Sequence, residues 1–150
     1  MIEIKLIDQD LAKLYEKDFK TYIGQVLKAN YIDNTDKRIE GIYNNMLEYI
    51  NDGSAFIVGA FQKEEMVGFI WAYERNLNNK KRYHINYFIV NEENRKQGIG
   101  KKLIDEIYKI AKKNNIEEIE LIVTERNSGA VKFYNKEDFK VERITLCKKL

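Results

Sequence analysis

Cysteine, histidine and proline are nearly missing from this chain of 150 residues, which contains one Cys, one His and no Pro. The single cysteine, Cys147, cannot form an internal disulfide, so a reducing compartment is permitted. One Cys and one His also fall short of the four ligands of a structural zinc site, and we therefore expect no metal. Cys147 itself is expected to be a small packed side chain near the end of the last strand.

Long apolar runs and an excess of charge of one sign are missing as well. No stretch approaches the ~18 consecutive apolar residues that a membrane helix needs, and residues 1–8 alternate polar and apolar types without a signal-peptide core. The net charge is only +2, and Lys and Glu are interspersed, whereas nucleic-acid binders usually concentrate basic charge on one face or tail. These absences predict a cytoplasmic protein that binds neither membranes nor nucleic acids.

No internal repeat and no linker rich in Pro, Gly or Ser divides the chain, so one domain over residues 1–150 is expected. The hydrophobic periodicity predicts elements in the order β-α-α-β-β-β-α-β-α-β-β. The expected strands cover residues 2–6, 55–61, 66–73, 83–90 and 116–123, followed by a last hairpin or strand pair over 139–150 with a turn near Arg143. The expected helices begin after Asp8 (with Leu11, Leu14, Tyr15 and Phe19 on one side), near Asp36, at Gly98 and at Ser128.

Hairpins outnumber crossover connections in this order of elements. We therefore expect an α/β (α+β) fold with a mixed, mostly antiparallel, twisted sheet that is flanked by helices. The polar segment 75–81 is expected to be a loop between two strands.

The segment after the strand that ends at Val90 indicates a binding site for pyrophosphate. A polar turn leads directly into a helix that opens on Gly-x-Gly. A helix N-terminus presents unpaired N–H groups and the positive end of its dipole, and glycines let a phosphate approach the backbone. The basic residues of the segment can neutralise the ligand. The residues expected to make these contacts are Arg95, Lys96, Gln97, Gly98, Ile99, Gly100 and Lys101.

Two other phosphate loops fit this segment badly. It has no Gly-Lys-[Ser/Thr] of a nucleoside-triphosphate loop and no third glycine of a dinucleotide fingerprint. A basic helix start without any ligand is the alternative that the residues alone leave open.

Two blocks of the chain together carry a resemblance to a known family. Residues 95–100, Arg-x-x-Gly-x-Gly after a strand that ends in Val, resemble the acetyl-CoA signature of the GNAT (Gcn5-related N-acetyltransferase) superfamily. Residues 127–139 are similar to the family block Asn-x-x-Ala-x-x-Phe-Tyr-x-x-x-Gly-Phe. The order of elements matches from the first strand onward. Glu92 replaces a frequent Pro, and Asp138 replaces the Gly of the second block, where Asp tolerates a left-handed conformation better than most residues.

The resemblance implies where acetyl-CoA binds. In this family the strand that ends at Val90 splays from the next strand, and the pantetheine arm of CoA lies in the gap. Backbone groups of Phe88, Ile89 and Val90 would then contact the arm and the thioester carbonyl, where an N–H donor stabilises developing negative charge. Plain packing in the core is the alternative role for these three residues.

The second block implies two further roles. Tyr134 matches the family tyrosine that often protonates the leaving thiolate, and a phenol is a hydrogen-bond donor at neutral pH. Its alternative role is that of a core aromatic, as for Phe133 beside it. Asn127 is expected either to hydrogen-bond the pantetheine arm or to cap the helix that follows.

His84 is the candidate general base, because the amine acceptor must lose a proton before or during attack. Some family members place a Glu or His at this distance from the loop, and an unperturbed imidazole titrates near pH 6.5. Strict alternation predicts that His84 shares a face with Asn86, Phe88 and Val90. An edge or surface histidine is the alternative. No carboxylate is expected on the following strand, where the matching stretch is taken to be residues 121–123.

The resemblance thus implies direct transfer of an acetyl group from acetyl-CoA to a primary amine of a small molecule, without a metal. Acetylation of a protein N-terminus or lysine, and a non-catalytic acyl-CoA-binding sensor, are the alternatives. Acceptor specificity is expected in residues 15–35, in residues 75–82 and in the last strands. The acceptor, the acyl length and the oligomeric state, a homodimer included, stay open.

Overall fold

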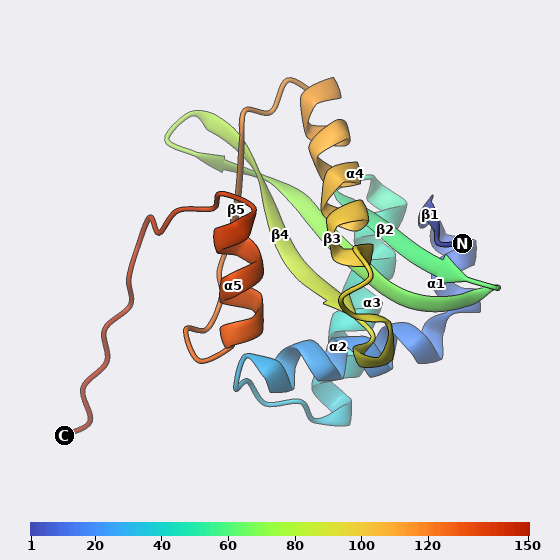
Figure 1. Ribbon diagram of the computed structural model, residues 1–150, viewed down its shortest axis with the longest axis horizontal. Coiled ribbons are helices and arrows are strands. Elements are labelled where there is room, and N and C mark those ends of the chain that lie inside the picture. The colour runs from blue at the N-terminus through green and yellow to red at the C-terminus, as the bar shows by residue number, and fades with distance from the viewer.

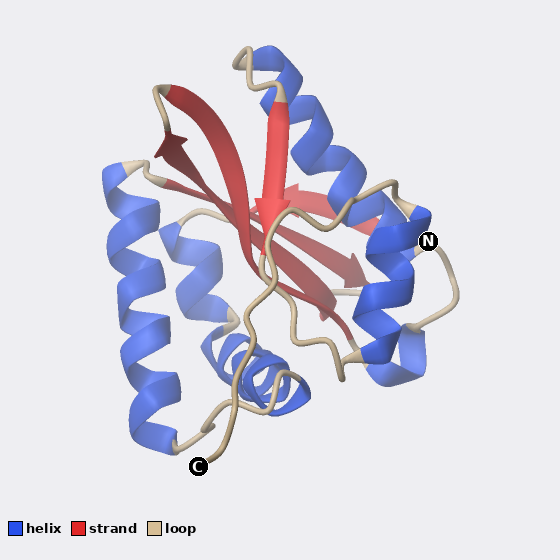
Figure 2. Cartoon of the chain, turned by 90° about the vertical axis from the view of Figure 1, so that its left-hand side faces the viewer, coloured by secondary structure: helices blue, strands red, loops and turns tan.

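A computed structural model describes residues 1–150 and places a five-stranded sheet between two groups of helices (Figures 1 and 2). The elements in chain order are β1 (Glu3–Leu6), α1 (Gln9–Leu14), α2 (Glu16–Ala29), α3 (Asp36–Asp52), β2 (Ala55–Gln62), β3 (Glu65–Leu77), β4 (Lys80–Val90), the 3-10 helix η1 (Glu92–Asn94), α4 (Ile99–Lys113), β5 (Glu118–Leu121) and α5 (Ser128–Lys136). The strands lie in the order β1-β2-β3-β4-β5, antiparallel except for the parallel pair β4–β5. The expected fold class is confirmed.

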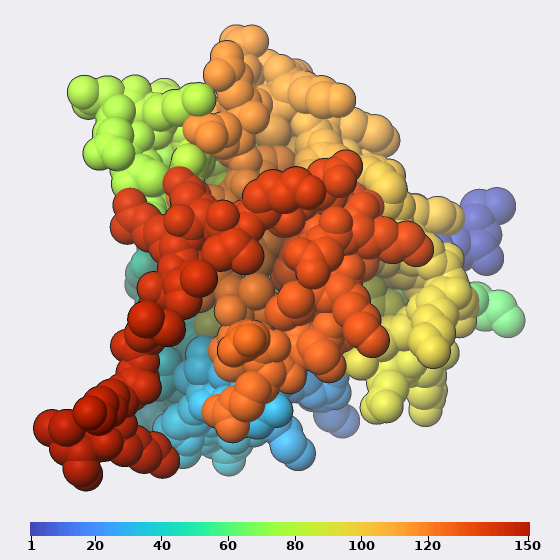
Figure 3. All heavy atoms as spheres, turned by 60° about the vertical axis from the view of Figure 1, so that its left-hand side comes forward, coloured from blue at the N-terminus to red at the C-terminus, as the bar shows by residue number.

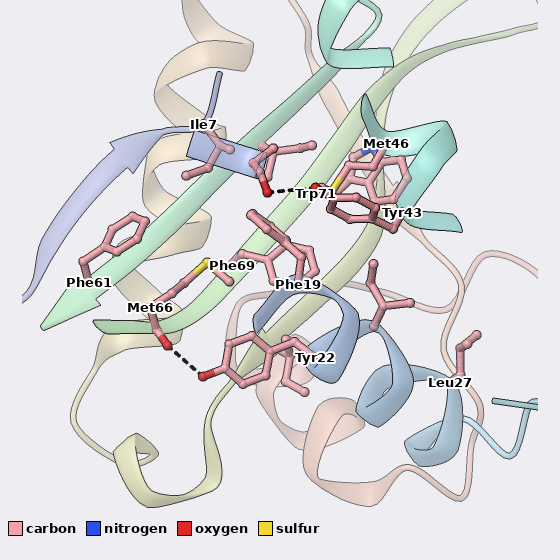
Figure 4. Packing of buried hydrophobic residues seen from close by; sticks show 14 residues of the cluster. Ile7, Phe19, Tyr22, Leu27, Tyr43, Met46, Phe61, Met66, Phe69 and Trp71 are labelled. Atoms are coloured by element: carbon pink, nitrogen blue, oxygen red, sulfur yellow. Dashed lines mark hydrogen bonds between the residues drawn. The ribbon is translucent and has the colours of Figure 1, made fainter. Parts of the chain in front are cut away.

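The hydrophobic core has two layers, because alternate side chains of the strands point to opposite faces of the sheet. One layer packs under α1–α3, and the other packs under α4. In the first layer the buried hydroxyls of Tyr22 and Tyr43 donate hydrogen bonds to the carbonyl oxygens of Met66 (2.8 Å) and Ala12 (3.0 Å), so neither is left unpaired (Figure 4). The two layers hold the sheet rigid from both sides.

Helix α4 buries one stripe against the sheet and leaves the other side to solvent. Its buried residues are Ile99, Leu103, Ile104, Ile107 and Ala111. Full burial of one such aliphatic side chain stabilises the fold by about 1.5–3 kcal/mol, so this stripe fixes the helix firmly over the sheet. No helix in the protein combines the length and the apolar composition that are needed to cross a membrane.

The first expected helix is in fact two helices. Asp8 caps α1 as predicted, because its carboxylate accepts a hydrogen bond from the N–H of Leu11 (2.8 Å). Tyr15 then leaves the helical conformation (φ −104°, ψ 26°) and separates α1 from α2. The break changes the helical phase, so Leu14 is exposed while Phe19 is buried in the core. The prediction that Leu14 lies on the buried side was wrong for this reason.

The segment 75–81 is part of a long hairpin and not a loop, which corrects the prediction. Strands β3 and β4 remain paired out to Leu77 and Lys80. The turn consists of Asn78 (φ 52°) and Asn79 (φ 64°). Asn tolerates positive φ, and two central residues with positive φ make the tight turn whose twist matches that of a hairpin.

The last predicted strands are absent. Residues 139–150, the C-terminal segment, form no helix or strand and run away from the sheet (Figure 1). The segment contains no Gly, Asn, Asp or Pro that would favour a tight turn near Arg143, so a hairpin has no suitable turn residue. Strand β5 is correspondingly shorter than the predicted 116–123, and Cys147 is exposed rather than packed.

Candidate functional site

The loop between β4 and α4 is held in a defined shape by hydrogen bonds to two backbone carbonyl oxygens. The N–H of Asn91 donates to the carbonyl oxygen of Val67 (2.7 Å), and Arg95 Nε donates to the carbonyl oxygen of Val90 (3.0 Å). Lys96 and Gly98 then adopt positive φ (62° and 76°) and turn the chain into the helix. A residue with a Cβ at Gly98 would be strained in this conformation, although no atom lies near enough to clash with it.

The start of α4 offers several unpaired N–H groups. The first bond of the helix runs from Lys102 N to the carbonyl oxygen of Gly98 (3.1 Å), and no side chain caps the helix. The N–H groups of Ile99, Gly100 and Lys101 therefore have no partner inside the helix. No acidic residue lies in the first turn to oppose an anion. These features fit a pyrophosphate group.

The residues of the loop differ in what they can offer. The side chains of Arg95, Lys96 and Gln97 are exposed, whereas that of Ile99 is buried in the core and leaves only its backbone N–H. The Lys101 ammonium forms an ion pair with Asp105 in the next turn of α4. This hydrogen bond raises the pKa of Lys101 above its ordinary value. Lys101 therefore offers an anion at the helix start its backbone N–H, because its ammonium group is already paired with Asp105.

The sheet opens between β4 and β5, beside the loop. These strands pair only from Arg82–Glu118 to Ile85–Leu121, so residues 86–90 have no partner on that side. We call this opening the inter-strand gap. The other edge of residues 88–90 is paired with β3. The backbone of Phe88, Ile89 and Val90 therefore lines the gap.

Helix α5 brings Tyr134 to the gap. The Tyr134 ring lies 6.3 Å from the Phe88 ring and 5.4 Å from the Phe139 ring, centroid to centroid. The Tyr134 hydroxyl makes no hydrogen bond within the protein, but it is not fully buried. The one fully buried polar side-chain atom without a partner is Trp71 Nε1. Burial of the ring raises the pKa of Tyr134 above its ordinary value, so the phenol keeps its proton at neutral pH.

The same helix packs on the loop through an aromatic contact. A Cβ added to Gly100 would meet Phe133 Cε2 at 3.3 Å and Phe88 Cζ at 3.6 Å. The glycine therefore serves the packing of α4 against α5 as well as ligand access. Asn127 stands at the N-cap position of α5, but its side chain makes no capping bond. The capping role considered for Asn127 is not the one it takes here.

A β-bulge places His84 on the face opposite to the predicted one. The pairing with β3 shifts between Trp71–Tyr87 and Ala72–Ile85, which leaves Asn86 as an extra residue. A bulge reverses the alternation beyond it. Phe88 and Val90 pack in the α4 layer, whereas His84 shares its face with Tyr73, whose ring lies 5.1 Å away. The prediction that His84 shares a face with Phe88 and Val90 was wrong because strict alternation was assumed.

His84 has a carboxylate partner on the neighbouring strand. Its Nδ1 lies 2.6 Å from Glu120 Oε2, and the two side chains are 8% and 14% exposed. A carboxylate only accepts hydrogen bonds, so Nδ1 carries the proton and Nε2 keeps its lone pair when the ring is neutral. Nε2 makes no hydrogen bond within the protein and, like the Tyr134 hydroxyl, is not fully buried. It is therefore free to accept a proton.

Glu120 in turn is held by two arginines. Arg75 Nη1 lies 3.3 Å from Glu120 Oε2, and Arg82 Nη1 lies 3.4 Å from Glu120 Oε1. Burial alone would raise the pKa of Glu120, but the hydrogen bond from His84 and the guanidinium charges outweigh it, so the pKa falls below its ordinary value. Arg82 also donates to Glu142 at 2.7 and 3.0 Å. We call this group the charge cluster; it consists of Arg75, Arg82, His84, Glu118, Glu120 and Glu142.

Sequence reasoning missed Glu120 because the stretch that is expected to face the site, residues 121–123, begins one residue after it and contains no carboxylate. The pattern Glu118-Ile119-Glu120, two acidic residues on one side of a strand, was the available signal. The parallel register, in which His84 pairs with Glu120, supplies what the sequence could not.

The connection between β5 and α5 is hydrogen-bonded to Asn30 at the end of α2. Thr124 donates from N–H to Asn30 Oδ1 (3.2 Å) and from Oγ1 to the carbonyl oxygen of Asn30 (2.9 Å). The Arg126 guanidinium lies 3.9 Å from the centre of the Tyr31 ring. The end of the expected acceptor region, residues 15–35, thus meets the β5–α5 connection. No group of three or more His, Cys, Asp or Glu side chains is placed to hold a metal ion.

A sheet that opens between two parallel strands, beside a glycine-rich helix start, is the arrangement of a CoA-dependent acyltransferase. Residues 9–139 match the model of the Acetyltransferase (GNAT) family. The chain is also 33% identical to spermidine N(1)-acetyltransferase from Thermoplasma acidophilum, in an alignment that covers 94% of this chain and 89% of that protein. The protein belongs to the GNAT family of acetyltransferases, whose members use acetyl-CoA.

Solved structures share the fold at low sequence identity. A predicted acetyltransferase from Clostridium acetobutylicum with acetyl-CoA aligns with a TM-score of 0.78 and 15% identity, covering 99% of this chain and 96% of that one. An aminoglycoside acetyltransferase from an uncultured soil metagenomic sample, in complex with sisomicin, aligns with a TM-score of 0.76, 16% identity and the same coverage. Ribosomal-protein-alanine N-acetyltransferase from Brucella melitensis biovar Abortus 2308 aligns with a TM-score of 0.72 and 16% identity, covering 100% and 99%.

Proposed function

We propose that the protein transfers the acetyl group of acetyl-CoA directly to a primary amine of a small molecule. The observation that supports the proposal is that Tyr134 and His84, two side chains whose chemistry suits proton transfer, lie on opposite sides of one gap. Tyr134 contacts Phe88, which packs in the α4 layer, and His84 faces the other side at the paired end of the gap. An incoming amine and a departing thiolate need proton transfer at two different places.

The cosubstrate would lie along the loop and the gap. The N–H groups of Gln97–Lys101 would bind its pyrophosphate, and the exposed side chains of Arg95 and Lys96 would neutralise the charge. The backbone of residues 88–90 and the unbonded side chain of Asn127 would contact the pantetheine arm. Bound acetyl-CoA supplies an acetyl group that is activated as a thioester.

The chain's own groups would then move the protons. His84 Nε2 accepts a proton from the ammonium of the acceptor, and the freed amine forms a bond to the acetyl carbon while the C–S bond breaks. A backbone N–H of residues 88–90 donates to the carbonyl oxygen as negative charge develops there. The nitrogen loses its second proton to water as the amide forms, Tyr134 donates its proton to the thiolate and is reprotonated through that water, and His84 releases the proton that it accepted to solvent. Glu120 holds His84 in the tautomer that this role requires.

A small-molecule acceptor is supported by the names of two relatives. The protein that is 33% identical is a spermidine acetyltransferase, and one structural neighbour holds the aminoglycoside sisomicin. Spermidine and sisomicin both carry several amino groups. A protein N-terminus is the acceptor that the name of another neighbour indicates. That neighbour and the sisomicin-bound one both share 16% identity with this chain, so the preference for a small molecule rests on the relative that is 33% identical.

The experiment is a screen for thiol release from acetyl-CoA across a panel of amines. The panel contains polyamines, aminoglycosides, amino acids and a peptide with a free N-terminus, and mass spectrometry identifies each product. We expect thiol release that depends on a small amine, with one acetyl group added to it. Acetylation of the peptide alone would move the assignment to protein acceptors. Calorimetric binding of CoA without turnover on any amine would identify a sensor.

A further inference from the structure

One wall of the inter-strand gap is not part of the sheet. Residues 88–90 on the β4 side are paired with β3. The side that continues β5 is the β5–α5 connection, residues 122–127, which follows Leu121, the last paired residue of β5. A hydrogen bond from Asn127 N to the carbonyl oxygen of Thr124 (2.9 Å) closes a turn inside this connection. Contacts outside the sheet must therefore set the position of this wall.

Asn30, at the end of α2, provides the hydrogen bonds that fix this wall. Its side-chain amide donates to the carbonyl oxygen of Val26 (3.0 Å), which orients the amide so that Oδ1 accepts from Thr124 N (3.2 Å). Its carbonyl oxygen accepts from Thr124 Oγ1 (2.9 Å). Apart from bonds within the connection and to α5, these two from Thr124 are the hydrogen bonds that residues 122–127 make. Figure 3 shows this part of the chain, in orange, lying against the end of α2, in light blue.

Tyr31, the next residue, has a backbone conformation that tyrosine rarely adopts. It ends α2 with φ 59° and with a hydrogen bond from Ile32 N to the carbonyl oxygen of Leu27 (2.9 Å). Three other helices end with the same kind of bond and the same left-handed backbone, and they use residue types that tolerate it. These residues are Gly53, Asn115 and Asp138. A bulky residue at such a position costs stability, so the presence of a tyrosine there indicates a task for its ring.

The Tyr31 ring holds the guanidinium group of the connection. Arg126 lies 3.9 Å from the centre of this ring, and a cation is attracted to the face of an aromatic ring at that distance. Arg126 directly precedes Asn127, whose side chain makes no capping bond and is proposed to contact the pantetheine arm. The strained residue thus holds the connection beside the place where the cosubstrate is proposed to lie.

We propose that Asn30 and Tyr31 are positioning residues for acetyl-CoA. Through Thr124 and Arg126 they fix the β5–α5 connection relative to β4, so that the gap already has the width that the pantetheine arm requires. Such preorganisation increases affinity, because the wall does not have to be ordered when the ligand binds. The inference rests on the proposed function, since it takes acetyl-CoA to lie in the gap, and it assigns the end of α2 a part in binding it.

The first experiment compares the CoA affinity and the thermal stability of Tyr31→Asn. Asn tolerates the left-handed conformation, so Tm should equal or exceed that of the wild type, whereas loss of the ring should lower CoA affinity by about fivefold. Isothermal calorimetry and thermal melts measure the two quantities. Tyr31→Phe keeps an aromatic ring and should bind CoA like the wild type. Asn115→Gly, at the equivalent end of α4, is the matched control and should leave the affinity unchanged.

A double-mutant cycle tests whether the effect passes through the connection. Arg126→Gln should lower CoA affinity about as much as Tyr31→Asn does, and the double variant should lower it little further, because both changes remove one contact. Thr124→Val removes the hydroxyl that donates to Asn30 and keeps the shape of the side chain, so it should also weaken CoA binding. In steady-state assays these variants should raise KM for acetyl-CoA several-fold and keep kcat within about twofold.

The outcomes separate this inference from the proposed function. Wild-type CoA affinity in both Tyr31→Asn and Thr124→Val would overturn the inference and leave the proposed function standing. Additive losses in the double variant would overturn it as well. A loss of affinity that accompanies a lower Tm in Tyr31→Asn would reduce the residue to a structural role and refute the inference. An unaltered chain that binds no CoA would refute the proposed function and the inference together.

Discussion

The two ends of the inter-strand gap are built in different ways. At the end where CoA is proposed to bind, the loop, its glycines and the start of α4 come from one stretch of about a dozen residues. At the other end, the charge cluster draws on β3, β4, β5 and the C-terminal segment, and its bonded partners lie up to 60 positions apart in the chain. The first end is formed mainly by one local stretch of chain, whereas the second exists only when the sheet is assembled. The difference predicts that damage to the two ends will have different consequences.

The largest effect is expected at the local end. Gly98→Val should reduce CoA affinity by more than about 10²-fold, because a β-branched residue resists the left-handed conformation and blocks close approach of the ligand. Isothermal calorimetry with CoA measures this. Gly129→Val, at an exposed glycine in α5 with ordinary φ and no atom near its added Cβ, is the matched control and should bind normally. Equal affinity in both variants would remove the loop from the binding site.

Tyr134→Phe tests the proposed proton donor, which α5 brings to the inter-strand gap. Turnover should fall by about 10²-fold while CoA affinity is retained, because the ring still packs on Phe88 and only the donated proton is lost. Burial raises the pKa of Tyr134, so the wild-type enzyme should show no alkaline loss of kcat from phenol ionisation up to about pH 10. Steady-state kinetics of both proteins across that range are the measurement. Unchanged turnover in the variant would leave Tyr134 with a packing role alone.

Glu120→Gln tests the assembled end and should have a smaller effect. The variant keeps an acceptor for His84 Nδ1 but removes the charge that stabilises the protonated ring. We expect kcat/KM to fall by about tenfold at neutral pH, because a neutral amide stabilises a protonated imidazole less than a carboxylate does; general base catalysis contributes about 10²–10⁴-fold in all. In the His84→Gln background the same substitution should change kcat/KM no further. Unchanged kcat/KM in the single variant would restrict Glu120 to a structural role.

The smallest effect is expected on stability, through Arg82. The pKa values of Glu118 and Glu142 lie below the ordinary range. For Glu118 the largest lowering of the pKa comes from the hydrogen bond with Lys80, and the Arg82 charge adds to it. For Glu142 the largest lowering of the pKa comes from the hydrogen bond with Arg82. A lowered carboxyl pKa contributes stability that is present above the ordinary value and is lost as the pH falls through the folded value. Arg82→Gln should therefore lower Tm by a few degrees at pH 7 and by less in acid.

Calorimetric melts of the two proteins at several pH values provide that comparison. Lys109→Gln, which removes an exposed pair with Glu106 only, is the control and should barely shift Tm at any pH. A Tm difference for Arg82→Gln that stays constant down to pH 3 would mean that the carboxylates are not its cause.

What the sequence predicted follows the same division. The loop, the buried stripe of α4 and the residues of α5 were predictable, because each depends on adjacent residues or on the regular spacing of apolar residues along one helix. The face of His84, the partner Glu120 and the fate of residues 139–150 were not, because they depend on one extra residue in β4, on the register of a parallel pair and on a missing turn. Periodicity gives no information on a bulge, since the extra residue carries no characteristic type.

The bulge at Asn86 has a consequence for how such an enzyme can diversify. The extra residue divides β4 into two halves with independent side-chain phases, and His84 and Tyr73 share one face of the outer half. In the proposed function the inner half would offer its backbone to the acetyl donor and the outer half would face the acceptor. Substitutions in the outer half would then alter which amines are accepted while the inner half keeps its geometry.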